Sequence, residues 1–143
     1  MSILENLQIG TLARDDFYKG PLLNVAKLEA WSNGIVERFD IKIGEVHDPV
    51  RTLSGGNQQK IVVGRSLDVN PRFIVAVNPT RGLDLRATKF VHEKILEAKR
   101  AGAAVVVFST DLDELAALAD RTLFMSGGRL GEATAANLVG ATE

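Results

Sequence analysis

The chain has 143 residues, of which 45% are hydrophobic and 24% are charged, a balance typical of one globular domain or of two small, closely joined subdomains. Its 17 basic and 18 acidic residues leave a net charge of −1, so the bulk charge does not favour binding to nucleic acid or to anionic lipid. The lack of cysteine excludes disulfides and thiolate metal sites, and no apolar run approaches the roughly 18–20 residues that cross a bilayer.

The first half of the chain is predicted to be helical. Apolar residues recur near helical spacing from Ile3 to Leu12, and Gly20-Pro21 then interrupts the pattern. The apolar positions between Leu22 and Phe39 predict one or two helices, with Asn33-Gly34 as the candidate interruption. A polar loop around residues 45–49 follows, and a further helix is predicted over about residues 57–67.

The second half alternates strands and helices. Strands are predicted over 73–77 (FIVAV) and 103–108 (AAVVVF), helices over 85–100 and 111–118, a hairpin around Gly127-Gly128, and a short last helix over 133–138. Because the two apolar runs lack alternation, we expect both strands to be buried on both faces in a parallel sheet covered by helices. The change in pattern near residue 70 predicts two units, a helical subdomain over 1–70 and an α/β core over 71–143.

The segment from Leu53 to Lys60 reads LSGGNQQK and has the features of a phosphate contact. Ser54 can cap the helix that follows and still donate its hydroxyl, while Gly55 and Gly56 allow a ligand close to the backbone. The free N–H groups and the dipole of the helix favour an anion at the same place. For the three residues Ser-Gly-Gly alone, a capped helix behind a Gly-Gly turn is the simpler interpretation.

The full eight-residue segment resembles the signature motif of ABC-transporter ATPases, in the NQQ variant typical of sugar- and nucleoside-import ATPases. Further matches follow in the family's order: Asn78-Pro79-Thr80 after a strand, the RGLD loop over 81–84, FSTDLDEL over 108–115, and Ala119-Asp120-Arg121. The resemblance covers essentially the whole chain. It implies an α/β fold made of part of a P-loop NTPase (RecA-like) parallel sheet with helices, plus an ABC-type helical subdomain.

Two segments of that family are missing from the chain. The sequence contains no G-x-x-x-x-G-K-[ST], the Walker A loop that cradles phosphates, and in this family both that loop and the Q-loop lie upstream of the helical subdomain. The resemblance implies ATP and Mg²⁺ as cofactors of the whole protein. We expect the chain alone neither to bind ATP tightly nor to hydrolyse it.

Three positions that carry catalytic groups in the family are changed. Val77 stands where an Asp helps to hold Mg²⁺, Asn78 stands where a Glu polarises the attacking water, and Thr110 stands where a His contacts the γ-phosphate. Loss of a positioned general base typically costs about 10²–10⁴-fold in rate. Thr110 equally suits a plain helix N-cap. The resemblance therefore implies a degenerate site with no catalytic residue and no metal ligand, as in the second, C-terminal ATPase domain of simple-sugar and nucleoside importers.

In this family two ATPase domains enclose two ATP molecules head to tail. The resemblance assigns signature contacts to Leu53, Ser54, Gly55, Gly56, Asn57 and Gln58, and a D-loop to Gly82, Leu83 and Asp84. Gln58 and Gln59 either add polar contacts near the nucleotide or are exposed helix residues. Asp84 either bonds across the domain interface or caps the next helix.

We expect the chain to serve an ABC importer by completing an ATP site on a second ATPase domain. The implied partners are that domain, the membrane permease and, indirectly, a substrate-binding protein, but no nucleic acid. The permease would hold the protein on the cytoplasmic face of the membrane. Phe17, Tyr18 and Trp31 are candidates for the permease surface or for the core. Nucleoside and simple sugar both remain open as cargo, and the alternatives are a non-transport ABC-type ATPase and a non-catalytic assembly module.

Overall fold

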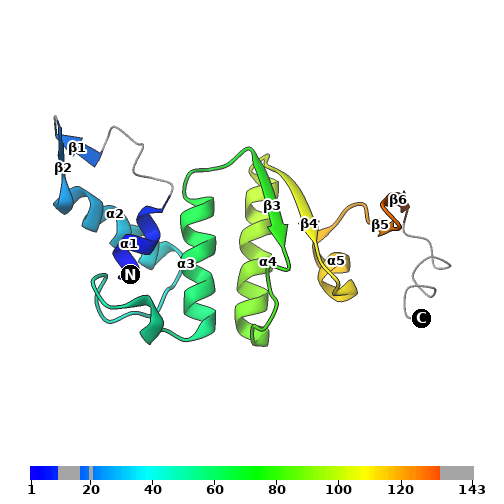
Figure 1. The fold of residues 1–143 in the computed structure, drawn as a ribbon, viewed down its shortest axis with the longest axis horizontal. Coiled ribbons are helices and arrows are strands. Elements are labelled where there is room, and N and C mark those ends of the chain that lie inside the picture. The colour runs from blue at the N-terminus through cyan, green and yellow to red at the C-terminus, as the bar shows by residue number, and fades with distance from the viewer. Residues whose placement is uncertain (10–16, 20, 133–143) are drawn as a thin grey trace.

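A computed structural model of the chain describes residues 1–9, 17–19 and 21–132 (Figure 1). In the first half the elements are α1 (Ile3–Gln8), β1 (Tyr18–Lys19), β2 (Leu22–Leu23), α2 (Val25–Arg38), the 3₁₀ turn η2 (Val50–Thr52) and α3 (Gly55–Leu67). In the second half they are β3 (Phe73–Val77), α4 (Leu85–Arg100), β4 (Ala104–Phe108), α5 (Leu112–Leu118), β5 (Leu123–Ser126) and β6 (Arg129–Glu132). None of the helices in the described part of the chain combines the length and the hydropathy of a transmembrane segment.

Helices α1, α2 and α3 pack around a common apolar core. Its buried members come from all three helices and from the segment after α2: Ile3, Leu7, Ile35, Phe39, Ile41 and Ile61. Helices α2 and α3 come close together at Gly64, where an added Cβ would lie 2.9 Å from Ile35 Cγ2. The signature helix α3 is therefore held against α2 by tight packing.

Strands β3 and β4 form a parallel pair with Phe73 opposite Ala104 and Val77 opposite Phe108. One face of the pair packs against α4, where Ala76, Val105 and Val107 contact the buried cluster of Val91, Ile95 and Leu118. The other face is open in the described structure and exposes Phe73, Val75, Val77, Val106 and Phe108. The expectation that both faces are buried was wrong for the described residues, because the helix layer covers only the face that meets α4.

Most of the predicted elements are confirmed, and the differences are local. The segment around Gly20-Pro21, expected to break a helix, separates two short strands in which Tyr18 pairs with Leu23. Helix α2 is capped by Asn24, whose Oδ1 accepts the Lys27 N–H at 3.1 Å, and it continues through Gly34 without interruption. Leu12 and the predicted helix over 133–138 lie outside the described residues.

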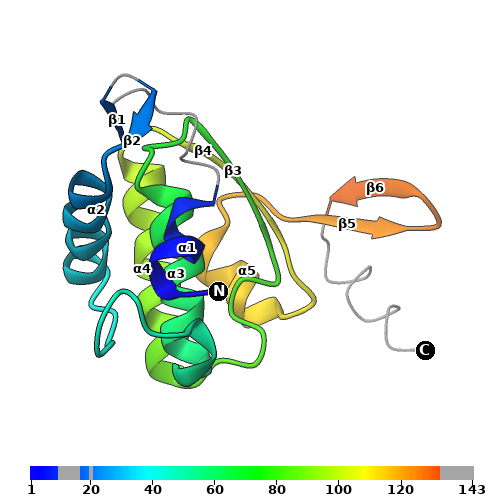
Figure 2. The ribbon, with the colours of Figure 1, turned by 60° about the vertical axis from the view of Figure 1, so that its left-hand side comes forward.

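The last two strands form an antiparallel hairpin with Leu123 opposite Glu132 and Ser126 opposite Arg129. The turn between them contains Gly127 and Gly128, both with positive φ (53° and 75°), which glycine adopts without steric cost. Figure 2 shows this hairpin extending away from the helices. The Gly-Gly hairpin predicted from the sequence is therefore confirmed.

Candidate nucleotide-contacting site

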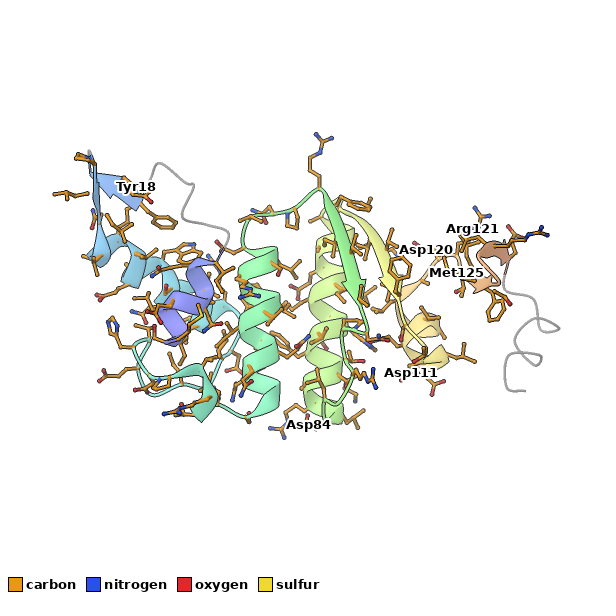
Figure 3. The ribbon with its side chains drawn as sticks, in the orientation of Figure 1. Tyr18, Asp84, Asp111, Asp120, Arg121 and Met125 are labelled. Atoms are coloured by element: carbon orange, nitrogen blue, oxygen red, sulfur yellow. The ribbon has the colours of Figure 1, made fainter. Side chains whose placement is uncertain are left out.

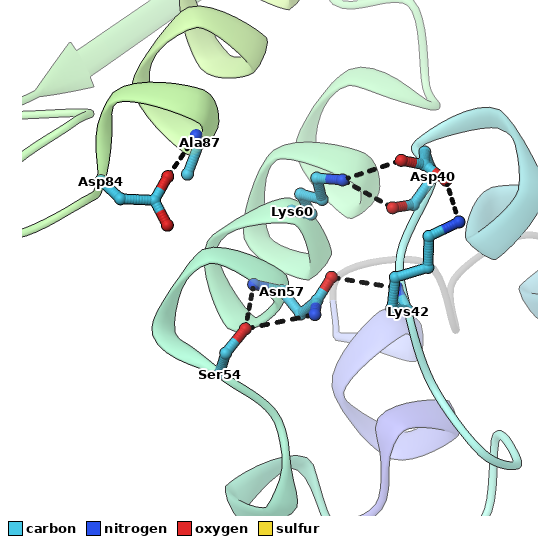
Figure 4. Close-up of polar contacts among 7 residues, drawn as sticks. All are labelled: Asp40, Lys42, Ser54, Asn57, Lys60, Asp84 and Ala87. Carbon is cyan, nitrogen blue, oxygen red and sulfur yellow. Dashed lines mark hydrogen bonds and ion pairs between the residues drawn. The ribbon is translucent and has the colours of Figure 1, made fainter.

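The N-terminus of α3 is formed by Ser54. Its backbone is extended (φ −61°, ψ 155°), and its Oγ accepts the Asn57 backbone N–H at 3.4 Å and the Asn57 side-chain amide at 3.2 Å (Figure 4). In both bonds the Ser54 oxygen is the acceptor, so its own O–H can still donate. Ser54 is exposed. The predicted helix cap is confirmed, and the hydroxyl lies where an incoming anion can reach it.

The three polar residues after the glycines bind parts of this chain. Asn57 Oδ1 accepts the Lys42 backbone N–H at 2.9 Å, which joins the signature loop to the segment after α2 (Figure 4). Gln58 donates its side-chain amide to the Leu53 carbonyl at 2.9 Å, and Leu53 packs against the helical core. Gln59 donates to the Pro79 carbonyl at 2.8 Å. In this state all three amides therefore stabilise the loop and its attachment.

The two glycines of the motif serve different purposes. An added Cβ at Gly56 would lie 3.3 Å from the Ala87 Cβ, so a small residue at 56 lets α3 and α4 come close together. At Gly55 no atom lies within 4 Å of an added Cβ. Gly55 therefore leaves open space in front of the helix, and there the backbone can approach a ligand.

The first turn of α3 fits a phosphate group. The N–H groups at the start of a helix lack intrahelical acceptors, and the helix dipole adds a partial positive charge. The lysine of the motif does not contribute, because Lys60 Nζ binds the Asp40 carbonyl at 2.6 Å and the Asp40 carboxylate at 3.3 Å. The Lys60 ammonium also lies 4.7 Å from the centre of the Phe90 ring. An anion at this end would therefore be held by neutral donors, namely the Ser54 hydroxyl and the amides of Gly55 and Gly56.

The carboxyl end of β3 offers little to a metal or a water molecule. Val77 points to the open face of the sheet with 64% of its surface exposed and has no oxygen in its side chain. Asn78 has a left-handed backbone (φ 45°), and its N–H donates to the Phe108 carbonyl at 2.7 Å. Among the described residues no group of three acidic, histidine or cysteine side chains is placed to hold a metal. Val77 and Asn78 therefore do not fit the Mg²⁺ that the family uses.

Thr110 does not cap α5. The cap is Asp111, labelled in Figure 3. Its Oδ1 accepts the N–H groups of Asp113 at 2.9 Å and of Glu114 at 3.2 Å. The capping alternative for Thr110 was wrong by one residue, because an aspartate also caps helices well and its negative charge complements the helix dipole. Thr110 is exposed beside this cap.

The predicted D-loop forms the start of α4. Gly82 has φ +77°, a backbone conformation that favours glycine, and Leu83 packs against the α4 core. Asp84 caps α4 by accepting the Ala87 N–H at 2.8 Å (Figure 4). The capping role of Asp84 is thus observed, and a bond across a domain interface stays a prediction.

The structure brings the sequence-predicted site residues to one end of the molecule. The N-termini of α3 and α4 are neighbours through Gly56 and Ala87, and the carboxyl ends of β3 and β4 are joined by the bond from Asn78 to Phe108. In Figure 1 the N-termini of α3 and α4 lie at the lower edge of the molecule, and β3 and β4 end above them.

Sequence reasoning missed a buried polar pair near this end. Thr80 Oγ1 donates to Glu114 Oε1 at 2.5 Å, and His92 Nε2 lies 3.4 Å from the same oxygen. Only 9% of Thr80 and 3% of Glu114 is exposed. The partners are 34 residues apart in sequence, and neither side chain belongs to a local pattern that indicates the contact.

Comparison with characterised proteins gives three informative relatives. The guanosine import ATP-binding protein NupO of Bacillus subtilis is 37% identical over 119 residues, and the nucleoside import ATP-binding protein NupA of Lactococcus lactis is 32% identical over 130 residues. These matches cover 80% and 91% of this chain. The ribose import ATP-binding protein RbsA 2 of Rhizobium meliloti is 38% identical over 116 residues, or 81% of this chain. The chain spans about a quarter of the length of the curated relatives that it matches (21% to 26%). No protein-family model matches it.

Solved structures agree with the sequence relatives. The dimeric ATP-binding cassette MJ0796, bound to ADP and phosphate, superposes with a TM-score of 0.71 at 21% identity, over 92% of this chain and 56% of that one. The cassette MJ1267 of an ABC transporter superposes with a TM-score of 0.69 at 25% identity, over 92% of this chain and 55% of that one. The chain therefore has the fold of part of an ABC ATPase cassette, and its sequence resembles the ATP-binding proteins of sugar and nucleoside importers over as much as 91% of its length.

Proposed function

We propose that this chain supplies the signature loop to an ATP site whose catalytic groups lie on a second ATPase domain. The main support for this proposal is the contrast between the N-terminus of α3 and the carboxyl end of β3. At the α3 N-terminus, Ser54 caps the helix, and its hydroxyl and the first-turn amides are neutral donors of the kind that bind phosphate. At the end of β3, Val77 and Asn78 offer neither a carboxylate for a metal nor a base for water.

The whole protein is proposed to be the ATP-binding subunit of an importer for nucleosides or simple sugars. The named functions of the relatives support this, since NupO, NupA and RbsA 2 are guanosine, nucleoside and ribose import ATP-binding proteins. The proposed cofactors of that whole protein are ATP and Mg²⁺, with Mg²⁺ held by the partner domain. The chain by itself is proposed to be inactive.

The open face of the sheet supports a role inside a larger ATPase domain. Val75 and Val77 on β3 lie beside Val106 and Phe108 on β4, and all four are exposed. Parallel sheets are normally covered on both faces, because their strands are apolar on both sides. We propose that the remaining part of the ATPase core, which carries the phosphate-binding loop, covers this face.

The proposed membrane partner is a permease that binds the helical half and holds the protein on the cytoplasmic face of the membrane. An exposed apolar patch at the start of that half supports this: Tyr18, Leu22, Leu23 and Val25. Phe17 is buried, and the centre of the Trp31 ring lies 5.2 Å from the centre of the Phe17 ring. Of the three candidate aromatic residues, only Tyr18 is therefore available for such a contact. Co-purification of the whole protein with a permease tests this part.

The proposed contribution of the signature loop to the ATP site of a second domain is tested by Ser54→Arg in the whole protein together with its partner domain. Arginine at the α3 N-terminus removes the hydroxyl donor and fills the space in front of Gly55. We expect ATP turnover to fall about 10²-fold or more, the size of effect seen when a preorganised donor to a developing charge is lost.

Ser66→Arg is the matched control, because Ser66 is an exposed serine on the same helix but far from its N-terminus. Turnover in this variant is expected to stay near that of the unmodified protein. A double change, Val77→Asp with Asn78→Glu, is expected to alter turnover by less than about twofold, since the proposed base lies on the partner. Normal turnover in Ser54→Arg, or a large gain in the double variant, would contradict the proposal.

A further inference from the structure

Three consecutive residues after β3 are each held by a different element. The Asn78 N–H donates to the Phe108 carbonyl at the end of β4 (2.7 Å). The Pro79 carbonyl accepts from Gln59 on α3 (2.8 Å), and Thr80 donates to Glu114 on α5 (2.5 Å). The loop over 78–80 is therefore the place where the signature helix, the second strand and α5 are joined.

Glu114 is the most deeply buried acidic side chain among the described residues, with 3% of its surface exposed. A carboxyl group in such a place is costly unless polar partners surround it. Here the partners are the Thr80 hydroxyl at 2.5 Å and His92 Nε2 on α4 at 3.4 Å. A buried group with bonds to two other elements tends to fix a unique geometry, so Glu114 can hold the 78–80 loop, α4 and α5 in one arrangement.

Gln59 makes the matching contact on the opposite side of the loop. It belongs to the signature segment, and its side chain is partly buried where α3 faces Pro79. The bond is to a backbone carbonyl, so it responds to the position of the loop and not to the type of side chain at 79. Together, Gln59 and the Thr80–Glu114 pair hold the loop from both sides.

We propose that Gln59, Thr80 and Glu114 are positioning residues that set the orientation of the signature helix relative to α5 through the 78–80 loop. Release of the Thr80–Glu114 contact then changes the environment of Gln59, although Gln59 and Glu114 are 55 residues apart in sequence. The consequence for ATP turnover rests on the proposed function. The joint, meaning the contacts of Gln59 and Glu114 with the 78–80 loop, is a property of the chain without nucleotide.

The first test compares ¹H–¹⁵N NMR spectra of the 143-residue chain and three variants. Thr80→Val keeps the shape of the side chain but removes its donor, so we expect the Gln59 side-chain amide signals to shift together with the backbone signals of Asn78, of residue 80 and of Arg81. Thr80→Ser keeps the hydroxyl and is expected to leave the Gln59 signals in place. Thr122→Val is the matched control at the start of the last hairpin. Unmoved Gln59 signals in a folded Thr80→Val chain would overturn the proposal.

A reciprocal variant keeps the test decisive if Thr80→Val does not fold. Gln59→Ala removes a partly buried amide from the α3 side, and we expect the backbone signals of Thr80 and the ring signals of His92 to shift. If the Gln59→Ala chain folds and its Thr80 and His92 signals do not shift, the proposal that the contacts are linked through the 78–80 loop is contradicted. Both spectra are recorded without ATP, so failure of Ser54→Arg to stop turnover would count against the proposed function and leave this result unaffected.

A double-mutant cycle measures the size of the coupling. Gln59→Ala and Thr80→Val are combined, and the unfolding equilibrium constants of the four chains are compared. Because the two side chains act on the same loop, we expect the double variant to differ by about twofold or more from the product of the single effects, the usual threshold for coupled sites. An exact product would mean that the two contacts are independent, and the proposed joint would be wrong.

Discussion

The helical half and the sheet half of the chain bury their apolar residues to different degrees. Around α1, α2 and α3 the apolar side chains face a common interior, and six of them are almost fully buried. The pair of β3 and β4 buries only the face that meets α4, and its other face is exposed. The three helices therefore enclose a core between them, whereas the two-stranded sheet is covered on one face only among the described residues.

The helical half and the sheet half also differ in the polar groups that each presents near the N-terminus of α3 and the end of β3. The signature loop on the helical side keeps its cap, its glycines and its bonds to the segment after α2. The end of β3 keeps its backbone position through Asn78 and Phe108 but lacks the carboxylates of the family. The hydrogen bonds that hold residues 78–80 after the strand involve the Phe108 carbonyl, Gln59 and Glu114, and none of them needs a carboxylate at Val77 or Asn78.

The largest expected effect on stability comes from a substitution in the helical core, and it is compared with a substitution on the open face of the sheet. Ile61 on α3 is 1% exposed, so Ile61→Ala leaves a cavity and is expected to lower the free energy of unfolding by about 2–5 kcal/mol. Val75 on the open face is 53% exposed, and Val75→Thr keeps its β-branched shape, so a change within about 0.5 kcal/mol is expected. Urea unfolding of both variants measures the difference. Equal losses would mean that the open face is covered in the folded chain.

The next largest effect is the change in stability when glycine is replaced by alanine at two positions in neighbouring helices. At Gly64 a methyl group would come within 2.9 Å of Ile35 and 3.4 Å of Phe39, so Gly64→Ala is expected to destabilise the chain by about 1–3 kcal/mol through overpacking. At Gly34 nothing lies within 4 Å, and Gly34→Ala is expected to stabilise α2 by up to about 1 kcal/mol. The shift of the thermal unfolding midpoint gives both signs. A stabilised Gly64→Ala chain would show that α2 and α3 can separate freely.

The order of elements and the signature cap could be predicted from the sequence, because they depend on local patterns. The apolar runs at 73–77 and 104–108, the glycine turn at 127–128 and the Ser54 cap all have short-range signals. The open face of the sheet could not be predicted, since a run of apolar residues does not reveal what covers it. The Thr80–Glu114 and Lys60–Asp40 contacts were missed because they join residues 34 and 20 positions apart. The division at residue 70 stays a prediction.

A smaller effect is expected inside the helical core. Ser32 on α2 is fully buried, and its Oγ has no hydrogen-bond partner among the described residues. A buried hydroxyl without a partner is unfavourable, so Ser32→Ala is expected to raise the free energy of unfolding by about 1 kcal/mol. Ser66→Ala is the control, because the exposed Ser66 hydroxyl already donates to the Val62 carbonyl at 2.7 Å. A loss of stability in Ser32→Ala would mean that the hydroxyl has a partner in solution.

The smallest effect concerns the charged contact that ties the signature helix to the segment after α2. The hydrogen bond from Lys42, followed by that from Lys60, lowers the pKa of Asp40 below its ordinary value of 3.8. Because the folded-state pKa is the lower one, the contact stabilises the fold above about pH 3.8 and is lost as the pH falls through the lowered pKa. Asp40→Asn isolates this charge, since asparagine tolerates the left-handed backbone at this position (φ 45°).

We therefore expect the unfolding midpoint of Asp40→Asn to lie slightly below that of the unmodified chain at about pH 7, and the two midpoints to converge in acid as Asp40 becomes protonated. The difference at neutral pH is also expected to shrink as salt is added, because the carboxylate is exposed to solvent. A difference that persists in acid would mean that the substitution acts by a route other than the carboxylate charge. The bond from Lys60 to the Asp40 carbonyl, at 2.6 Å, is not that route, because asparagine keeps the same carbonyl.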